Sequence, residues 1–258
     1  MSQRILEICV DSSVGLAAAI AGGADRIELC SALALGGLTP AQSLMREAAR
    51  APIPVHAMIR PRAGDFVFGG SEVELMLADI DDVCQGGLAG VVLGASRPDD
   101  RLDETCLRRL RDHAASLGLA TTLHRAFDLA PDLEAALESA IGLGFERVLT
   151  SGGASTAVAG LARLAELHEA ARGRISLMPG SGINPASIRT IAARVPVTEM
   201  HSSASEPAPS RSPRFRAFGF ETAALRQTST RIVGELRRAW QDIAEGRHDL
   251  PHEKDDAR

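Results

Sequence analysis

The 258-residue sequence has no tyrosine and one tryptophan, and aromatic residues make up only 3% of the chain. A recognition surface built on aromatic side chains is therefore disfavoured. The sequence also has no excess of positive charge, because its net charge is -5 and its pI is near 5.8. Nucleic acids and anionic membranes both attract clustered positive charge, so we expect neither as a partner.

Long apolar runs and closely spaced cysteines are absent as well. No stretch approaches the roughly 20 apolar residues of a membrane-spanning helix, and the opening MSQRILEICV is too short for a secretory signal. We therefore expect a cytoplasmic protein. Cys9, Cys30, Cys84 and Cys106 form no CxxC pair. This spacing disfavours a disulfide framework and a cysteine-rich zinc site, so we expect four free thiols.

What the sequence does contain is a repeating alternation of β-like runs and helix-like segments, at roughly 30 residues per unit. Eight such runs cover residues 5–10, 25–30, 54–61, 90–95, 120–127, 147–152, 174–180 and 198–204. This count predicts an α/β fold, a (β/α)8 TIM barrel in a single domain. An open doubly wound sheet is the alternative, but the first turn, CVDSSVG, lacks the GxGxxG pattern typical of it. We expect the barrel to span residues 1–245 and the polar tail 246–258 to be disordered.

The connections between the runs carry signals of their own. Capping residues predict helix starts at Thr39 and Asn184, each before a proline, and a capping box that begins at Ser71. The segment 206–219 follows the last β-like run and is rich in proline, serine and arginine. It is either a lid over the barrel mouth or a solvated surface loop.

The alternation of side chains along each run predicts which faces point into the barrel. Helices cover the outside of such a barrel, so the outward side chains must be apolar. In the run 54–61, Val55, Ala57 and Ile59 are the apolar set, which leaves His56, Met58 and Arg60 inside. The same reasoning places these polar and ionisable side chains inside: Glu7, Cys9, Arg26, Glu28, Cys30, Thr122, His124, Glu199, His201 and Ser203. Arg26 and Glu199 come early in their runs and predict a structural ion network, whereas residues late in the runs predict ligand contacts at the mouth.

Several loops at the predicted mouth add groups that could bind an anion. MIRPRAGD and LHRAFD supply arginines, and SGG, PGSGI and HSSA are small-residue turns that let backbone amides approach a phosphate. The candidates for substrate binding are Arg60, Arg62, Arg125, Ser151, Gly152, Gly180, Gly182, His201, Ser202 and Ser203. The candidates for acid–base catalysis are His56, His124, Glu7, Glu28 and Asp128.

A set of longer motifs gives the sequence a family resemblance. They are LEICVDS, GADRIELCSALALGGLTP, IPVHAMIRPRAGDF, LHRAFD, RVLTSG, MPGSGI and EMHSSA, and they run from about residue 5 to 205. On these motifs the sequence resembles the CutC family, which is named for copper homeostasis. The resemblance implies a single soluble (β/α)8 barrel, a cytoplasmic homo-oligomer and a link to copper.

The link to copper depends on residues with soft ligand atoms. Cu(I) prefers thiolate, thioether and imidazole ligands. Cys9 and Cys30 end adjacent parallel strands on the inward face, and such strands lie about 4.8 Å apart, so two thiolates could hold Cu(I) as a cofactor or cargo. Met58 or His56 lies on the next strand. The alternative is that both cysteines only fill space inside the barrel.

Two functions remain open from the sequence. The first is a copper-binding protein with Cys9 and Cys30 as metal ligands, which the family name favours. The second is an enzyme that acts on a small anionic or phosphorylated metabolite at the mouth of the barrel. The residue pattern favours the second, because a copper carrier needs two or three soft ligands but not arginines, histidines and glycine turns together at one mouth.

Overall fold

Eight parallel strands form the barrel in the computed structural model, which describes residues 4–221 and 225–244. The strands are β1 (Ile5–Val10), β2 (Arg26–Leu29), β3 (Val55–Met58), β4 (Gly90–Leu93), β5 (Ala120–Leu123), β6 (Arg147–Thr150), β7 (Ser176–Pro179) and β8 (Glu199–Ser202). They pair in the order β7-β6-β5-β4-β3-β2-β1-β8, and β7 and β8 pack against each other to close the circle. The predicted barrel is confirmed, while the predicted disordered tail lies outside the described residues.

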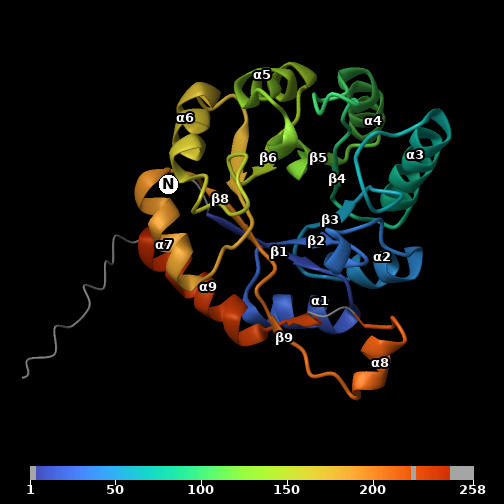
Figure 1. Ribbon diagram of the computed structural model, residues 1–258, viewed down its shortest axis with the longest axis vertical. Coiled ribbons are helices and arrows are strands. Elements are labelled where there is room, and N and C mark those ends of the chain that lie inside the picture. The colour runs from blue at the N-terminus through green and yellow to red at the C-terminus, as the bar shows by residue number, and fades with distance from the viewer. Residues whose placement is uncertain (1–3, 222–224, 245–258) are drawn as a thin grey trace, which may run out of the picture.

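Helices surround the barrel as an outer ring (Figure 1). They are α1 (Ser13–Gly22), α2 (Gln42–Ala48), α3 (Gly70–Gln85), α4 (Glu104–Ser116), α5 (Leu133–Leu143), α6 (Leu161–Ala171), α7 (Pro185–Arg194) and α9 (Thr230–Ala244). Two 3-10 turns, η1 (Leu33–Leu35) and η2 (Arg125–Leu129), follow β2 and β5. After β8 come β9 (Ser205–Pro207), α8 (Pro213–Ala217) and β10 (Arg226–Thr228), and β9 pairs with β10 in an antiparallel hairpin. Across these ranges, no helix has both the length and the apolar character that crossing a bilayer requires.

The strand register explains which side chains meet inside the barrel. Ile8, Ile27 and Val55 belong to the apolar core between the strands and the helices, so the other parity faces inward. The inward set then pairs across neighbouring strands, with Glu7 opposite both Arg26 and His201, Cys9 opposite Glu28, and Glu28 opposite His56. The predicted parity is confirmed for these strands.

A buried ion network lies inside the barrel toward the N-terminal ends of the strands. Arg26 donates hydrogen bonds to Glu7 and Glu199, and the Glu199 carboxylate also accepts from Ser176 Oγ at 2.7 Å and lies 3.3 Å from the guanidinium of Arg147. Burial opposes the charge on Arg26, but Glu7 and Glu199 together raise its pKa. The network predicted from the positions of Arg26 and Glu199 is therefore present, and it links β8 to β1, β2, β6 and β7 by side chains.

The predicted helix starts are confirmed in one case and wrong in two. Asn184 caps α7, where its Oδ1 accepts from the amides of Ala186 and Ser187 at 3.0 Å. Helix α3 begins before Ser71, because the Glu72 carboxylate accepts from the Gly69 amide at 2.8 Å and caps the helix from two residues before Ser71. Helix α2 begins at Gln42, because the hydroxyl of Thr39 instead accepts from the Arg60 amide and donates to Asp79.

Candidate functional site

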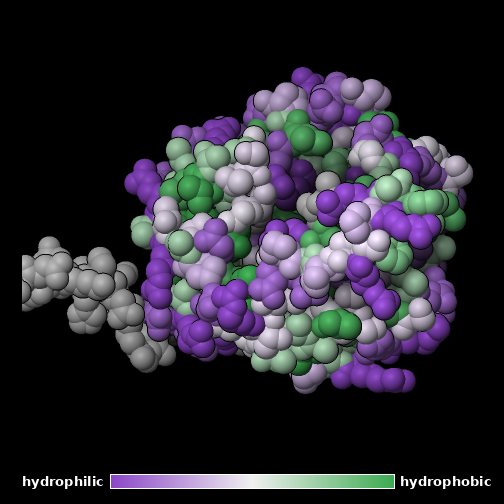
Figure 2. Space-filling model, turned by 60° about the horizontal axis from the view of Figure 1, so that its bottom comes forward, coloured by the Kyte–Doolittle hydropathy of each residue, from purple (hydrophilic) through white to green (hydrophobic). Residues whose placement is uncertain are grey.

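A cavity of about 940 Å³ opens where the strands end at their C-terminal side. The face shown in Figure 2 is hollowed near its middle, and both hydrophilic and hydrophobic residues surround the hollow. Its lining comes from strand ends, from the loops that follow them and from the start of α9, and includes Cys9, Glu28, Met58, Arg60, Phe66, His124, Arg125, Asp128, Gly182, Asn184, His201, Ser202, Ser203, Ser205, Arg226 and Arg231. The cavity therefore lies at the end of the barrel where the sequence places the site.

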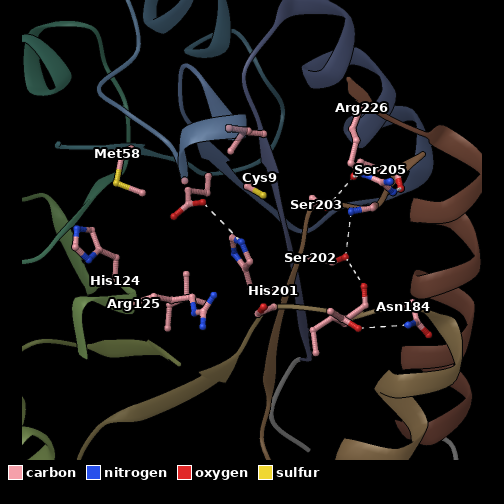
Figure 3. Close-up of a pocket in the computed structure, with 18 of the residues that line it drawn as sticks. Cys9, Met58, His124, Arg125, Asn184, His201, Ser202, Ser203, Ser205 and Arg226 are labelled. Carbon is pink, nitrogen blue, oxygen red and sulfur yellow. Dashed lines mark hydrogen bonds and ion pairs between the residues drawn. The ribbon is translucent and has the colours of Figure 1, made fainter. Parts of the chain in front are cut away.

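His201 lies at the floor of this cavity and is held from below. Its Nδ1 lies 2.8 Å from Glu7 Oε1, and Glu7 is fully buried beneath it. Its other ring nitrogen, Nε2, lies 3.7 Å from Glu28 Oε2. Figure 3 shows His201 between Cys9 and the side of the cavity that carries His124. The buried carboxylate thus fixes the orientation of an imidazole whose second nitrogen faces the cavity.

The ionisation of the floor follows from this geometry. Burial opposes the charge on Glu7, but Arg26 and His201 lower the pKa of this carboxyl far below its usual range. Burial also opposes the charge on His201, but the neighbouring Cys9 and Glu28 raise its pKa well above the usual value. Glu28 behaves differently, because burial raises its pKa and the nearby positive charges offset this only in part. Two carboxyl groups on the same floor therefore have pKa values shifted in opposite directions.

Arginine and histidine side chains form one wall of the cavity. Arg60 donates from its Nη atoms to the carbonyl oxygens of Leu35, Gly37 and Gly64, at 2.9, 3.1 and 2.7 Å. His124 ends β5 and caps η2, because its Nδ1 accepts from the Ala126 amide at 3.1 Å. The predicted strand 120–127 is therefore wrong beyond residue 123, where this cap turns the chain into η2.

Serines and the start of α7 form the opposite wall (Figure 3). Ser202 Oγ donates to the Ile183 carbonyl at 2.8 Å and accepts from the Ala204 amide at 3.0 Å, which joins the loops after β7 and β8. Arg226 reaches this wall from β10 and donates to Ser205 Oγ at 2.9 Å. Arg226 is exposed and also donates to the Ser205 carbonyl, and no carboxylate within the described ranges forms an ion pair with it.

Many of the predicted site residues meet at this cavity, and some do not. Those that line it are Cys9, Glu28, Arg60, His124, Arg125, Asp128, Gly182, His201, Ser202 and Ser203. Arg125 and Asp128 pair with each other at 2.8 Å, and the Asp128 carboxylate also accepts from Ser151 and Gly153, so both are held by the protein. Ser151 lies behind them in this network.

The other predicted residues lie off the cavity lining. Arg62 donates to Glu72 at 2.5 Å and pairs with Asp65 at 3.0 Å, which directs it toward the start of α3. Gly152 and Gly180 have no space for a side chain, because a Cβ there would lie 2.6 Å from the Gly160 carbonyl oxygen and 2.5 Å from a Leu149 methyl. Residues 206–219 do not line the cavity either, and most of them are exposed.

Other cavity residues were missed by sequence reasoning. Arg226 and Arg231 lie more than twenty residues beyond the last predicted strand, and no motif marks them. Asn184 was recognised only as a helix cap, although that cap already indicated that α7 starts at the mouth. Phe66 packs against His124 with ring centroids 4.8 Å apart, and its position directly after the RPRAGD motif is the signal that the sequence offers.

Comparison with known proteins identifies the family of this chain. The model of the CutC family matches residues 4–206. The chain belongs to the CutC family. CutC family proteins of Sinorhizobium medicae and Caulobacter vibrioides are 53% and 54% identical to it over 237 residues, covering 92% and 91% of this chain and 96% of each relative.

Solved structures agree on the fold. The structure of the copper homeostasis protein CutC from Streptococcus agalactiae superposes with a TM-score of 0.73 at 28% identity, covering 78% of this chain and 99% of that one. Thiamine phosphate pyrophosphorylase from Pyrococcus furiosus superposes with a TM-score of 0.57 at 15% identity, covering 93% of this chain and 96% of that one. The second likeness concerns the barrel fold alone.

The CutC family is named for copper homeostasis, so the cysteines and their neighbours are the residues to compare with a copper site. Cys9, Glu28 and His201 each offer one ligand atom, and these atoms all lie within 4.8 Å of one another. Cys30 is fully buried beside them, with its Sγ 3.7 Å from Glu28 Oε2, and packs against Met58. Three possible metal ligands therefore lie together at Cys9, and the other two are Glu28 and His201, which the sequence suggested for catalysis and substrate binding. His56 lies deeper in the barrel and off the cavity lining.

Burial disfavours the thiolate form of both Cys9 and Cys30. Burial raises the pKa of Cys9, and burial together with the Glu28 carboxyl raises the pKa of Cys30 still further. All four cysteines are free, as predicted. Because thiolates bind metals and thiols bind them weakly, metal binding here requires release of a proton.

Proposed function

We propose that the cavity is the active site of an enzyme that transfers a proton to or from a small, polar, anionic metabolite. The observation that supports this most is the 2.8 Å contact between Glu7 and His201 at the floor of the cavity. A buried carboxylate that orients an imidazole toward a ligand-sized space is the arrangement that acid–base catalysis needs. A carrier of a single ion has no use for a cavity of about 940 Å³.

Each floor residue has a role in this proposal. Glu7 stabilises the protonated form of His201 through Nδ1, so His201 is the proton donor. Glu28, whose pKa burial raises, is the group that accepts or returns the proton. Their separation of 3.7 Å places both beside the same ligand atoms.

The wall formed by the serines and α7 supports the anionic part of the proposal. It combines the loops after β7 and β8, which hold phosphate in many barrels, with the positive charge of Arg226. Of the arginines expected from the sequence, Arg62 and Arg125 contribute less, because each pairs with a carboxylate of the protein. The negative group of the metabolite therefore binds beside Ser203 and Gly182 rather than beside Arg62.

Hydrogen exchange on the substrate tests this function without knowledge of the complete reaction. A panel of phosphorylated hydroxy-aldehydes and hydroxy-ketones is incubated with the protein in D₂O, and proton NMR follows loss of the carbon-bound protons. We expect exchange with the unmodified protein and at least a 100-fold loss in His201→Gln. His168→Gln is the matched control, because His168 lies on α6 away from the cavity. Absence of exchange across the panel, or equal exchange in His201→Gln, contradicts the proposal.

A second candidate function is copper binding, and the cluster of Cys9, Glu28 and His201 favours it. In this candidate Cys9 and His201 supply a thiolate and an imidazole to Cu(I), and Cys30 is the second thiolate expected from the sequence. Ligation of the metal would repay the cost of ionising the buried thiols.

Competition for Cu(I) tests the second candidate. The double variant Cys9→Ser and Cys30→Ser is expected to lose Cu(I) to a chelator that the unmodified protein resists. The matched control is Cys84→Ser with Cys106→Ser, because these cysteines lie on α3 and α4 outside the barrel. Unchanged Cu(I) affinity in the first variant excludes the Cys9 and Cys30 site.

A further inference from the structure

Two buried nitrogen atoms, one from each of two residues that line the cavity, lack hydrogen-bond partners in the described chain. His124 accepts from the Ala126 amide through Nδ1, so its proton is on Nε2, and Nε2 contacts no acceptor in the described chain. Arg60 uses its Nη atoms on three carbonyl oxygens, and its Nε also contacts no acceptor there. Both residues line the cavity, and they are only 4% and 5% exposed. A buried donor without a partner is costly, so an acceptor from outside the protein is the natural complement.

The surroundings hold these two donors in place. The Phe66 ring lies against both, with its centroid 4.8 Å from that of His124 and 4.7 Å from the Arg60 guanidinium carbon. Behind His124 is Gly94, where a Cβ would lie 2.3 Å from His124 Cε1. The imidazole therefore packs directly on the backbone of Gly94, where no residue with a side chain would fit. Donors fixed in this way before a ligand arrives need no reorganisation when charge develops on it.

We propose that Arg60 Nε–H and His124 Nε2–H together bind the carbonyl oxygen of the substrate and stabilise the negative charge that this oxygen gains. The substrate is then a carbonyl compound with a proton on the adjacent carbon, such as a hydroxy-aldehyde or hydroxy-ketone. This inference rests on the proposed proton-transfer function of the same cavity and adds the class of substrate and the step.

The step balances as an enolisation. The bond between the adjacent carbon and its hydrogen breaks, and the proton passes to the floor carboxylate of Glu28. The electron pair of that bond forms a carbon–carbon double bond, and the carbonyl π pair moves onto the oxygen that faces Arg60 and His124. Return of a proton from Glu28 to the same carbon, as the oxygen's electron pair re-forms the carbonyl bond, completes a hydrogen exchange with no oxidant or reductant. Return to the former carbonyl carbon completes an isomerisation only when the hydroxyl proton of the adjacent carbon also passes to the oxygen beside Arg60 and His124.

The chemistry of the wall favours an oxygen acceptor over other ligand groups. A carbonyl oxygen has two lone pairs and can accept from both N–H groups at once. A cationic group is disfavoured beside the Arg60 guanidinium. Burial and the Arg60 charge lower the pKa of His124 to about 3, so the ring is a neutral donor in the physiological range. Met58 and Phe66 give this part of the cavity an apolar lining, which strengthens the contact with a charged oxygen.

Binding of an enediolate mimic tests the proposal separately from turnover. Glycolohydroxamate and its phosphate ester are the probes, because a planar hydroxamate resembles an enediolate, and calorimetry measures their affinity. His124→Asn keeps an acceptor for the Ala126 amide, but its shorter side chain leaves no N–H donor at the position of Nε2, whereas the longer side chain of His124→Gln places an amide donor near that position. We expect His124→Asn to weaken hydroxamate binding about 100-fold or more, the usual loss for one such donor, and His124→Gln to recover most of it.

Arg60→Lys tests the second donor, because lysine keeps the charge but has no Nε–H at that position. Thermal unfolding without ligand shows whether this variant folds, and if it does not, the comparison of His124→Asn with His124→Gln decides. Equal affinity of His124→Asn and unmodified protein overturns the inference, as does absence of hydroxamate binding by unmodified protein at millimolar concentration. If substrate exchange then still depends on His201, the proposed function survives and only the donor pair is wrong.

Discussion

Replacement of Arg26 by methionine is expected to destabilise the barrel strongly at neutral pH. The variant removes the shared partner of Glu7 and Glu199, two carboxylates that lie inside the barrel. Breaking a buried ion pair from one side costs about 3–5 kcal/mol. The two losses do not add in full, because Glu7 keeps His201 and Glu199 keeps Arg147 and Ser176. We therefore expect about 3–5 kcal/mol in total, a large part of the stability of an ordinary domain.

The pH dependence of this loss identifies its cause. In the unmodified protein the pKa values of Glu7 and Glu199 are lowered, so their stabilisation is present above their ordinary pKa and is lost only as pH falls below it. Without Arg26 these pKa values rise, and protonation at mildly acidic pH relieves the buried charge. The difference in unfolding free energy between variant and unmodified protein should therefore shrink from pH 7 to pH 5.

Urea unfolding at the two pH values measures both effects. Arg163→Met is the matched control, because Arg163 pairs with Glu134 at 3.0 Å and Glu166 at 2.7 Å on exposed helix surfaces. An exposed pair of this kind contributes at most about 1 kcal/mol. If Arg26→Met costs no more than this control, or costs the same at both pH values, the buried network does not stabilise the fold as argued.

Further predictions concern histidines and glycines. Burial lowers the pKa of His56 to about 4 and that of His124 to about 3, so NMR should find both rings neutral from pH 5 to 8. The neutral rings therefore contribute to the free energy of unfolding above the ordinary histidine pKa. Below that pKa, each ring lowers the free energy of unfolding by about 1.4 kcal/mol per pH unit until its own lowered pKa is reached. Urea unfolding of His124→Asn should lack the part of this pH dependence that His124 contributes. Gly94→Ala should destabilise by about 1–3 kcal/mol because its Cβ would lie 2.3 Å from His124, whereas Gly70→Ala, with no atom within 4 Å, should cost nothing in the same thermal unfolding series.

The fold and the inward faces could be predicted because each depends on a short-range pattern. Alternation along a strand means that either Glu7 or Ile8 faces the helices. Because the helices pack an apolar face on the barrel, Ile8 must face them and Glu7 must face inward. The roles of the arginines could not be predicted in this way. Whether Arg60 meets a ligand or the carbonyl oxygens of Leu35 and Gly37 depends on the path of the loop after β2, which no local pattern specifies.

Residues brought from far along the chain were also beyond sequence reasoning. Arg226 reaches the cavity only because β10 pairs with β9, and the sequence of either strand alone is too short to predict that pairing. The group of possible metal ligands had a similar difficulty. Cys9 and Cys30 were compared because both are cysteines, whereas the register places Glu28 and His201 around Cys9.

The closing contact between β7 and β8 affects how the barrel opens. These strands are the two ends of the pairing order in the described chain, and side chains such as Ser176 and Glu199 join them. A side-chain junction resists separation less than a ladder of backbone hydrogen bonds does. Local opening should therefore begin there, and backbone amides along β7 and β8 should exchange with solvent before those of β2 to β4. The ion network would then set the rate at which water reaches the floor of the cavity from the opposite end.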